Sequence, residues 1–273
     1  MPERTARPLV FGVLNVTPDS FSDGGRWIET DAAIRHARRL IADGADVIDI
    51  GGESTRPGAV RVDPGEEQAR VISLIAVLAA EGATVSVDTM NASTALAAAA
   101  AGASIINDVS GGLADADMAS VAASTGLTFV AMHWRGHSNG MDELAQYDDV
   151  VAEVRTELAA RVAALVAAGV AAEKIVLDPG LGFAKQAQHN WHLLGRLDEL
   201  ASLGHPLLIG ASRKRFLGAL LPEGSPVEAR DLPTAVVSAL SAQAGVWGVR
   251  VHDVASTQRA LDVLSSWQSG HRD

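Results

Sequence analysis

The chain alternates between short apolar runs and longer stretches with helical periodicity. Eight runs, most of them rich in β-branched residues, predict strands at residues 9–15, 46–51, 84–89, 104–109, 128–133, 174–179, 206–212 and 246–252. Most of these runs lack the apolar–polar alternation of a half-exposed strand. Continuous apolar runs are typical of parallel strands that are covered on both faces. The pattern therefore predicts a parallel sheet with helices packed against it.

The segments between these runs carry helix signals. Residues 31–44 predict a helix that ends at a glycine, with an apolar stripe formed by Ile34, Ala37, Leu40 and Ile41. A similar stripe closes the sequence, formed by Val254, Leu261, Leu264 and Trp267. Eight strand–helix units without a linker predict one α/β domain, a single (β/α)8 TIM barrel over residues 1–273 with its core at about 9–268. A doubly wound open sheet is the alternative fold.

Polar residues follow nearly every predicted strand. They are Asn15, Glu53, Asp88, Asn107, His133, Asp178, Ser212, Arg250 and His252. Barrel enzymes keep their chemistry at the carboxyl ends of the strands, so the set as a whole predicts a site at that rim. A single Asp or Asn after a strand is more often a turn or a helix cap, and this alternative stays open for individual members.

Composition and charge narrow the class of partner. A net charge of −11 disfavours nucleic acid, and no apolar run approaches the roughly 20 residues of a membrane span. The sequence contains no cysteine, which excludes disulfides and thiolate metal sites. The first residues do not resemble a signal peptide. We therefore expect a cytoplasmic protein, and local basic clusters keep an anionic small substrate compatible with the acidic mean charge.

Three of the rim residues indicate a pocket for a planar ligand. Asp88, Asn107 and Asp178 each end an apolar run, where a carboxylate or an amide must find partners. A buried carboxylate matches a ligand with two parallel N–H donors, and a neighbouring Asn offers both a donor and an acceptor. A buried capping role is the alternative interpretation, more so for Asp88 than for Asp178.

Basic residues gather at the ends of the last two predicted strands. Residues 212–215 place a hydroxyl and three cations between a strand and a helix, and Arg250 and His252 are two positions apart on one strand face. Cations and helix-start N–H groups attract an anion. A solvated basic turn is the alternative for residues 212–215, and a structural histidine is the alternative for His252.

Two polar loops follow the first two predicted strands. Residues 16–25 are polar apart from Val16 and the aromatic Phe21, and residues 51–59 are rich in glycine and carry Arg56. Loops of this kind are typically functional or mobile.

Seven segments, in this order, resemble the dihydropteroate synthase family of pterin-binding barrel enzymes in folate synthesis. They are LNVTPDSFSDGG, DIGGESTRPGA, SVDT, INDVSGG, LDPGLGF, GASRKRFLG and VRVHD. The resemblance spans about residues 9–268. Residues 134–147 are most similar to actinobacterial members, and we interpret His137 within them as a loop residue without a catalytic role.

The resemblance implies a transferase. The family joins 6-hydroxymethyl-7,8-dihydropterin pyrophosphate to 4-aminobenzoate and gives 7,8-dihydropteroate and pyrophosphate. It further implies Mg²⁺ as a cofactor, a homodimer, and sulfonamides as competitive inhibitors.

The family motifs also imply a role for each matching residue. The pterin would be held by Asp88, Asn107, Asp178 and Lys214, in a slot lined by Met132 and Phe183. Asn15 would bind Mg²⁺, and the pyrophosphate would be held by Arg56, Arg250 and His252. The aminobenzoate pocket would be shaped by Phe21, Thr55, Pro57 and Ser212. Asp23 would stabilise the cation that forms as pyrophosphate leaves.

The chemistry of such a reaction fits these residue types. Departure of pyrophosphate before attack leaves a delocalised pterin cation, so the site must neutralise the leaving group and place a negative group near the cation. Mg²⁺ keeps several waters, so one amide oxygen and the substrate phosphates suffice to hold it. Two alternatives are a pterin-dependent methyltransferase, which would not need residues 210–218 or the two long loops, and a pterin-binding paralogue without turnover.

Overall fold

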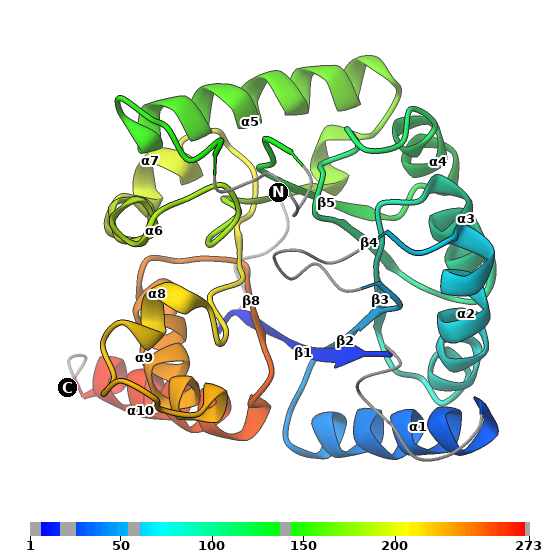
Figure 1. Cartoon of the computed structure of the whole chain (residues 1–273), viewed down its shortest axis with the longest axis horizontal. Helices are drawn as coiled ribbons and strands as arrows, with labels where there is room; N and C mark the ends of the chain where they lie inside the picture. The colour runs from blue at the N-terminus through cyan, green and yellow to red at the C-terminus, as the bar shows by residue number, and fades with distance from the viewer. Residues whose placement is uncertain (1–6, 17–25, 54–60, 137–142, 271–273) are drawn as a thin grey trace.

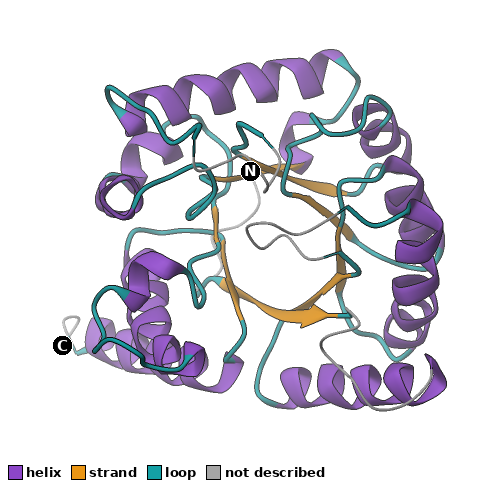
Figure 2. Cartoon of the chain, viewed as in Figure 1, coloured by secondary structure: helices purple, strands orange, loops and turns teal. Residues whose placement is uncertain are grey.

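The computed structural model describes residues 7–16, 26–53, 61–136 and 143–270. Within these ranges, eight parallel strands form a nearly closed barrel, and helices surround it (Figures 1 and 2). This arrangement confirms the predicted TIM barrel and excludes the open doubly wound sheet. The strands are β1 Leu9–Asn15, β2 Val47–Gly51, β3 Val85–Asp88, β4 Ile105–Asp108, β5 Thr128–Met132, β6 Ile175–Asp178, β7 Leu208–Ile209 and β8 Gly248–Val251.

The strands pair in the order β6-β5-β4-β3-β2-β1-β8-β7. The seam between β6 and β7 is closed by a bridge between Leu177 and Leu207, where the Leu177 N–H donates to the Pro206 carbonyl at 2.9 Å. Strand β7 is shorter than the predicted run of 206–212. Pro206 has no N–H to donate to a neighbouring strand, so the regular ladder begins only after it.

The barrel is wrapped by α1 Arg26–Ala42, α2 Pro64–Ala80, α3 Ala92–Ala100, α4 Met118–Thr125, α5 Val150–Ala167, α6 Ala187–Gly195, α7 Leu197–Ala201, α8 Arg215–Gly218, α9 Asp231–Gln243 and α10 Val254–Ser269, with 3-10 turns η2 Ala172–Lys174 and η3 Val227–Arg230. Side-chain caps fix several starts. Asp63 accepts from the Gly65 N–H at the start of α2, and Asp149 accepts from Val151 and Ala152 at the start of α5. None of the helices in the described residues is long and apolar enough to cross a bilayer.

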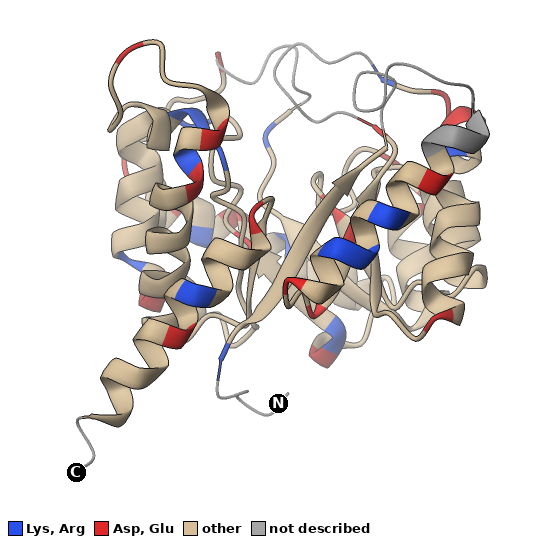
Figure 3. Ribbon diagram, turned by 90° about the horizontal axis from the view of Figure 1, so that it is seen from below, with Lys and Arg blue, Asp and Glu red and all other residues tan. Residues whose placement is uncertain are grey.

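Two of the predicted apolar stripes are narrower in the structure. In α1, Ala37 and Leu40 are buried but Ile41 is 39% exposed, because successive helical residues point about 100° apart. In α10, Val254 and Leu261 are buried but Trp267 is 71% exposed. Figure 3 shows the reason, since the last turns of α10 project past the ends of the strands. Ile41 and Trp267 therefore belong to the predicted stripes but not to the buried core.

Strand register aligns polar residues at one level of the rim. In adjacent parallel strands, Asn15 pairs with Gly51, Gly51 with Asp88, and Asp88 with Asn107. On the opposite wall of the barrel, Met132 of β5 pairs with Asp178 of β6 in the same way. The register therefore places residues that are far apart in the sequence around one opening.

Candidate active site

The interior of the barrel is built in two layers. The lower layer is an apolar cluster of Phe11, Val47, Ile105, Val130, Val176 and Leu208. Side chains that are two positions apart on a strand share a face. The next inward positions after Val47, Ile105 and Val176 are therefore polar, namely Asp49, Asn107 and Asp178. An apolar layer therefore fills the lower part of the barrel, and a polar layer lies above it at the carboxyl ends of the strands.

Arg250 joins two carboxylates in this polar layer. Its Nε lies 2.5 Å from Asp49 Oδ2, and its terminal nitrogen lies 2.6 Å from Asp88 Oδ2. Asp49 is fully buried and Asp88 nearly so. Burial raises the pKa of Asp88, Arg250 opposes that shift, and the nearby charge of Asp49 adds to it. Burial would lower the pKa of Arg250, but Asp49 and Asp88 more than offset this, so the guanidinium is charged.

Asp49 also orients Asn107. Nδ2 of Asn107 lies 3.2 Å from Asp49 Oδ2 and 3.4 Å from Asp49 Oδ1. An ionised carboxylate can only accept, so the amide must turn its NH₂ group toward Asp49. The carbonyl oxygen of Asn107 is then the acceptor that remains for a ligand.

Asp178 occupies the opposite wall with a tight turn after it. Its Oδ1 accepts from the Gly180 N–H at 2.7 Å. Gly180 has φ +67°, and a Cβ there would lie 2.4 Å from the His133 carbonyl oxygen, so only glycine fits. Burial raises the pKa of Asp178, while the charge of Lys214 and the Gly180 N–H lower it. The other oxygen, Oδ2, lies beside the strand-end glycine Gly210.

Lys214 and Phe183 meet above Asp178. The Lys214 ammonium lies 4.5 Å from the centre of the Phe183 ring and donates to the Leu181 carbonyl. Burial lowers the pKa of Lys214 to about 8, and Asp178 opposes this. Phe183 packs against an apolar cluster of Met90, Val109 and Met132. A flat apolar wall, a cation and a carboxylate thus share one side of the opening.

The members of the predicted basic cluster at residues 212–215 have different partners in the structure. Ser212 Oγ lies 2.9 Å from His252 Nδ1 and accepts from the His252 N–H at 3.1 Å. Arg213, in contrast, forms an ion pair with Asp231 at 2.7 Å. Arg215 is exposed on α8. Lys214 lies beside Phe183 and Asp178, in the polar layer of the barrel.

The structure links Asp88 to Arg250 directly, and Asp49 links Arg250 to Asn107. It also groups Asp178, Lys214, Phe183 and Met132 on the facing wall, and it pairs Ser212 with His252. Asn15 lies at the level of Asp88, because a Cβ on Gly51 would lie 3.6 Å from both Asn15 Oδ1 and Asp88 Oδ2. Five predicted site residues and one loop residue lie outside the described residues, namely Phe21, Asp23, Thr55, Arg56, Pro57 and His137.

Sequence reasoning missed two buried charged residues in this region, Asp49 and Lys185. Asp49 lies inside an apolar run, yet it occupies the same inward face as Val47, two positions earlier. A strict period of two along each strand would have found it. Lys185 lies beyond the end of a strand in a turn, where no periodicity applies. The sequence carries no clear signal that it is buried.

The fold and the rim together define a class of protein. This is a TIM-barrel enzyme whose polar layer, at the carboxyl ends of the strands, has the acceptor, donor and cationic groups for a small, flat, polar ligand. The model of the pterin binding enzyme family matches residues 11–252, and the chain belongs to that family.

Curated and solved relatives cover almost the full chain. The dihydropteroate synthase of Mycobacterium leprae is 54% identical over 263 residues, which span 94% of this chain and 93% of that protein. The Yersinia pestis dihydropteroate synthase, solved with a sulfonamide drug complex, superposes with a TM-score of 0.90 at 41% identity over 97% of this chain and 95% of that one.

The Xanthomonas albilineans dihydropteroate synthase has been solved with two different ligands. The complex with 4-aminobenzoic acid has a TM-score of 0.88 at 43% identity and covers 97% of this chain and 93% of that one. The complex with 7,8-dihydropteroate has a TM-score of 0.86 at 40% identity and covers 98% and 95%.

Proposed function

We infer that this chain catalyses the dihydropteroate synthase reaction of folate synthesis. It condenses 6-hydroxymethyl-7,8-dihydropterin pyrophosphate with 4-aminobenzoate and releases 7,8-dihydropteroate and pyrophosphate. The observation that carries this conclusion is the polar layer itself, in which Asp88, Asn107 and Asp178 line one opening with Lys214 and Arg250. Relatives that are similar to the chain are named dihydropteroate synthase, and two solved ones hold 4-aminobenzoic acid or 7,8-dihydropteroate.

Pterin recognition follows from the geometry of donors and acceptors. A pterin ring presents an amidine-like pair of N–H donors, which a carboxylate such as Asp178 accepts side by side. Asn107, oriented by Asp49, offers a carbonyl oxygen to another N–H of the ring. Lys214 donates from the rim, while Phe183 and Met132 cover the ring with apolar surface. We propose these contacts as the pterin site.

Departure of pyrophosphate is the step that needs positive charge. The bonds from Arg250 to Asp49 and Asp88 use two of the five N–H donors of a guanidinium, so further donors suit the leaving phosphate. His252, held by Ser212, is the second group proposed to hold pyrophosphate, and Arg56 is the third. Asp23 is proposed to stabilise the pterin cation, and the arylamine then attacks without needing a strong base.

A divalent metal fits the donors around Asn15. Among the described residues, no cluster of three or more His, Cys, Asp or Glu side chains forms a cage for a metal ion. Mg²⁺ does not require one, because it binds through few protein oxygens and keeps waters and substrate phosphates as its other ligands. The amide oxygen of Asn15, a hard donor at the level of Asp88, is therefore a suitable ligand. When bound, Mg²⁺ would neutralise charge on the departing pyrophosphate.

The second substrate is proposed to bind at the outer edge of the opening. Ser212 is the described member of the predicted aminobenzoate pocket, beside Phe21, Thr55 and Pro57. Sulfonamides resemble 4-aminobenzoate in shape and charge, so we propose that they compete for this pocket. A single domain over the whole chain and a cytoplasmic location remain predictions from the sequence.

Product formation tests the proposed function directly. Purified protein, incubated with the pterin pyrophosphate, 4-aminobenzoate and Mg²⁺, should form 7,8-dihydropteroate that mass spectrometry detects. Asp178→Ala should abolish pterin binding in a calorimetric titration, because the ring N–H donors would be buried without partners. Pterin binding without product by the wild type would favour a non-catalytic paralogue, and methyl transfer from a methylated pterin would favour the methyltransferase alternative.

A further inference from the structure

The turn after β6 contains a buried lysine that the proposed reaction does not use. Lys185 is 8% exposed. Its Nζ lies 2.9 Å from His133 Nδ1 and donates to the Phe183 carbonyl at 3.1 Å. Burying an ammonium group is costly, so a lysine is retained at such a position only where its donors have partners.

His133 connects Lys185 to the outer helix α5. Its Nε2 lies 2.8 Å from Glu157 Oε2. Burial lowers the pKa of His133 to about 4, so the ring is neutral near pH 7. Burial would raise the pKa of Glu157, but hydrogen bonds from His133 and Arg135 lower it to about 2. The ionised Glu157 accepts from Nε2–H, which leaves Nδ1 as the acceptor for Lys185.

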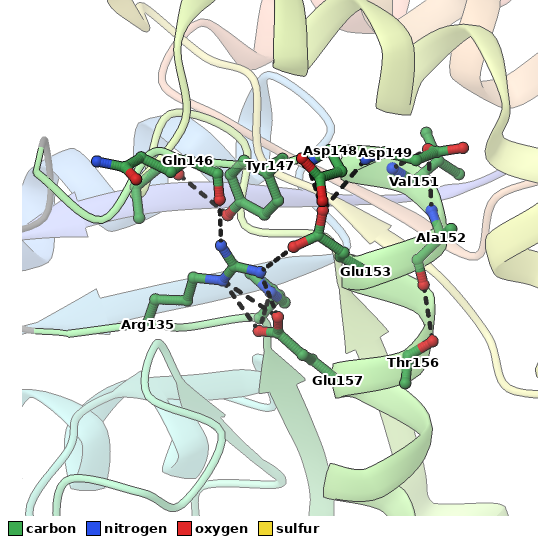
Figure 4. Close-up of polar contacts among 12 residues, drawn as sticks. Arg135, Gln146, Tyr147, Asp148, Asp149, Val151, Ala152, Glu153, Thr156 and Glu157 are labelled. Atoms are coloured by element: carbon green, nitrogen blue, oxygen red, sulfur yellow. Dashed lines mark hydrogen bonds and ion pairs between the residues drawn. The ribbon is translucent and has the colours of Figure 1, made fainter.

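Arg135 closes the network on the outside, as Figure 4 shows. Its guanidinium donates to Glu157, to Glu153 at 2.8 Å and to the Gln146 carbonyl at 2.7 Å. It also lies 3.9 Å from the centre of the Tyr147 ring. One guanidinium thus ties together α5, the end of β5 and the segment that leads into α5.

Tyr147 connects this network to the turn after β6. Its hydroxyl donates to the Ala184 carbonyl at 3.0 Å. Ala184 has φ +46°, a left-handed conformation that costs free energy in a residue with a Cβ and persists only where the surroundings hold it. Lys185 and Tyr147 therefore fix two successive carbonyls, those of Phe183 and Ala184.

We propose that Lys185 is a positioning residue of the pterin site, which holds Phe183 and the turn after Asp178 in place through the His133–Glu157–Arg135 network. This inference rests on the proposed function, since it holds that Lys185 affects the binding of the pterin substrate and not that of 4-aminobenzoate. Lys185 has no contact with the reacting atoms in this proposal. Its effect passes through the Phe183 wall, which packs against Met132 and Lys214.

The electrostatics of this region support the assignment. Burial and the charge of Lys214 lower the pKa of Lys185, Asp178 opposes them, and the resulting pKa is about 7. The positive charge of Lys185 in turn lowers the pKa of Asp178 and favours its carboxylate form. A carboxylate is the form that accepts two N–H donors from a pterin.

Lys185→Met tests the proposal because methionine keeps the length and loses the donors and the charge. We expect the KM for the pterin pyrophosphate to rise by about tenfold or more, and the KM for 4-aminobenzoate to change by less than about twofold. The melting temperature should change by only a few degrees, because removing a costly buried ammonium offsets the cost of leaving the His133 and Phe183 acceptors without a donor. Lys174→Met, at an exposed lysine in η2, is the matched control and should change none of these values.

Tyr147→Phe is a second variant that keeps the ring beneath Arg135 and removes only the donation to Ala184. It should raise the pterin KM in the same direction by about two- to fivefold. An unchanged pterin KM in Lys185→Met, or parallel losses of both KM values and of thermal stability, would overturn the proposal. A calorimetric titration with 6-hydroxymethylpterin keeps this test separate from the proposed function, because it compares pterin affinity in the wild type and Lys185→Met without requiring turnover.

Discussion

Asp49 lies in the polar layer and contacts a cation, Arg250, and a neutral amide, Asn107. It neutralises part of the charge on Arg250 and sets the direction of the Asn107 amide. In the proposed pterin site the ligand binds Asn107, and Asp49 acts on it through the Asn107 amide. Its role is one of orientation, and it depends on the carboxylate being able only to accept hydrogen bonds.

Asp49→Asn removes this constraint while it preserves shape. The new amide can donate or accept, so the Asn107 amide is free to turn and Arg250 keeps a single carboxylate partner. We expect pterin affinity, measured by calorimetry, to fall by about ten- to a hundredfold. Asp46→Asn, at the partly exposed carboxylate that binds Arg7, is the control and should leave pterin affinity unchanged. Equal affinities in the wild type and Asp49→Asn would show that Asp49 does not orient the site.

At the scale of elements, strand β6 and the turn after it each supply a residue of the site. Strand β6 ends at Asp178, and the turn that follows returns to the barrel at Phe183. That turn depends on Gly180, whose left-handed φ and missing side chain let it pass the His133 carbonyl. The position of Phe183 therefore depends on a glycine as well as on the lysine that follows.

Gly180→Ala should destabilise the protein in two ways, through backbone strain at a positive φ and through a steric clash. The new Cβ would lie 2.4 Å from the His133 carbonyl oxygen, so the turn or β5 must move. We expect a loss of about 2–4 kcal/mol in the free energy of unfolding, measured with urea. Gly204→Ala is the matched control, since φ is +81° and no atom lies within 4 Å of the new Cβ. It should lose only about 1 kcal/mol from conformational strain. Similar losses in both variants would refute the steric argument.

Much of the fold could be predicted at this scale because parallel buried strands leave continuous apolar runs. Strand β1 matches its predicted range, and β7 begins later than predicted because Pro206 cannot donate. The rim residues could be found because they end these runs. Asp49 and Lys185 could not be found in that way, since one interrupts a run and the other lies in an aperiodic turn. Trp267 lies on a part of α10 that extends past the barrel, which helical periodicity alone does not reveal.

At the scale of the molecule, two neighbouring helices present apolar side chains to solvent. The exposed residues are Leu232, Val236 and Leu240 on α9 and Val263 and Trp267 on α10. The three on α9 are spaced by four, so they form one stripe, and α9 and α10 lie side by side in Figure 1. Exposed apolar patches of this kind mark interaction sites. We propose that the predicted homodimer forms when a second copy of the chain packs against this α9–α10 patch.

Leu240→Glu tests this dimer surface. Leu240 is 61% exposed in one chain, so the charge should cost the folded barrel little, but it would be buried in a dimer. Analytical ultracentrifugation should show a dimer for the wild type and a monomer for the variant, with unchanged circular dichroism. Leu113→Glu, at an exposed leucine after β4, is the control and should remain dimeric. A dimer that persists in Leu240→Glu would place the interface elsewhere.

The central claim is that one barrel opening brings a pterin pyrophosphate, 4-aminobenzoate and a divalent metal together and releases pyrophosphate. The most direct measurement is pyrophosphate release by the purified chain, followed in real time with each component omitted in turn. The account predicts sustained release only when the pterin substrate, 4-aminobenzoate and Mg²⁺ are all present, and its loss in Asp178→Ala. No release from the complete mixture, or sustained release that does not depend on 4-aminobenzoate, would contradict it.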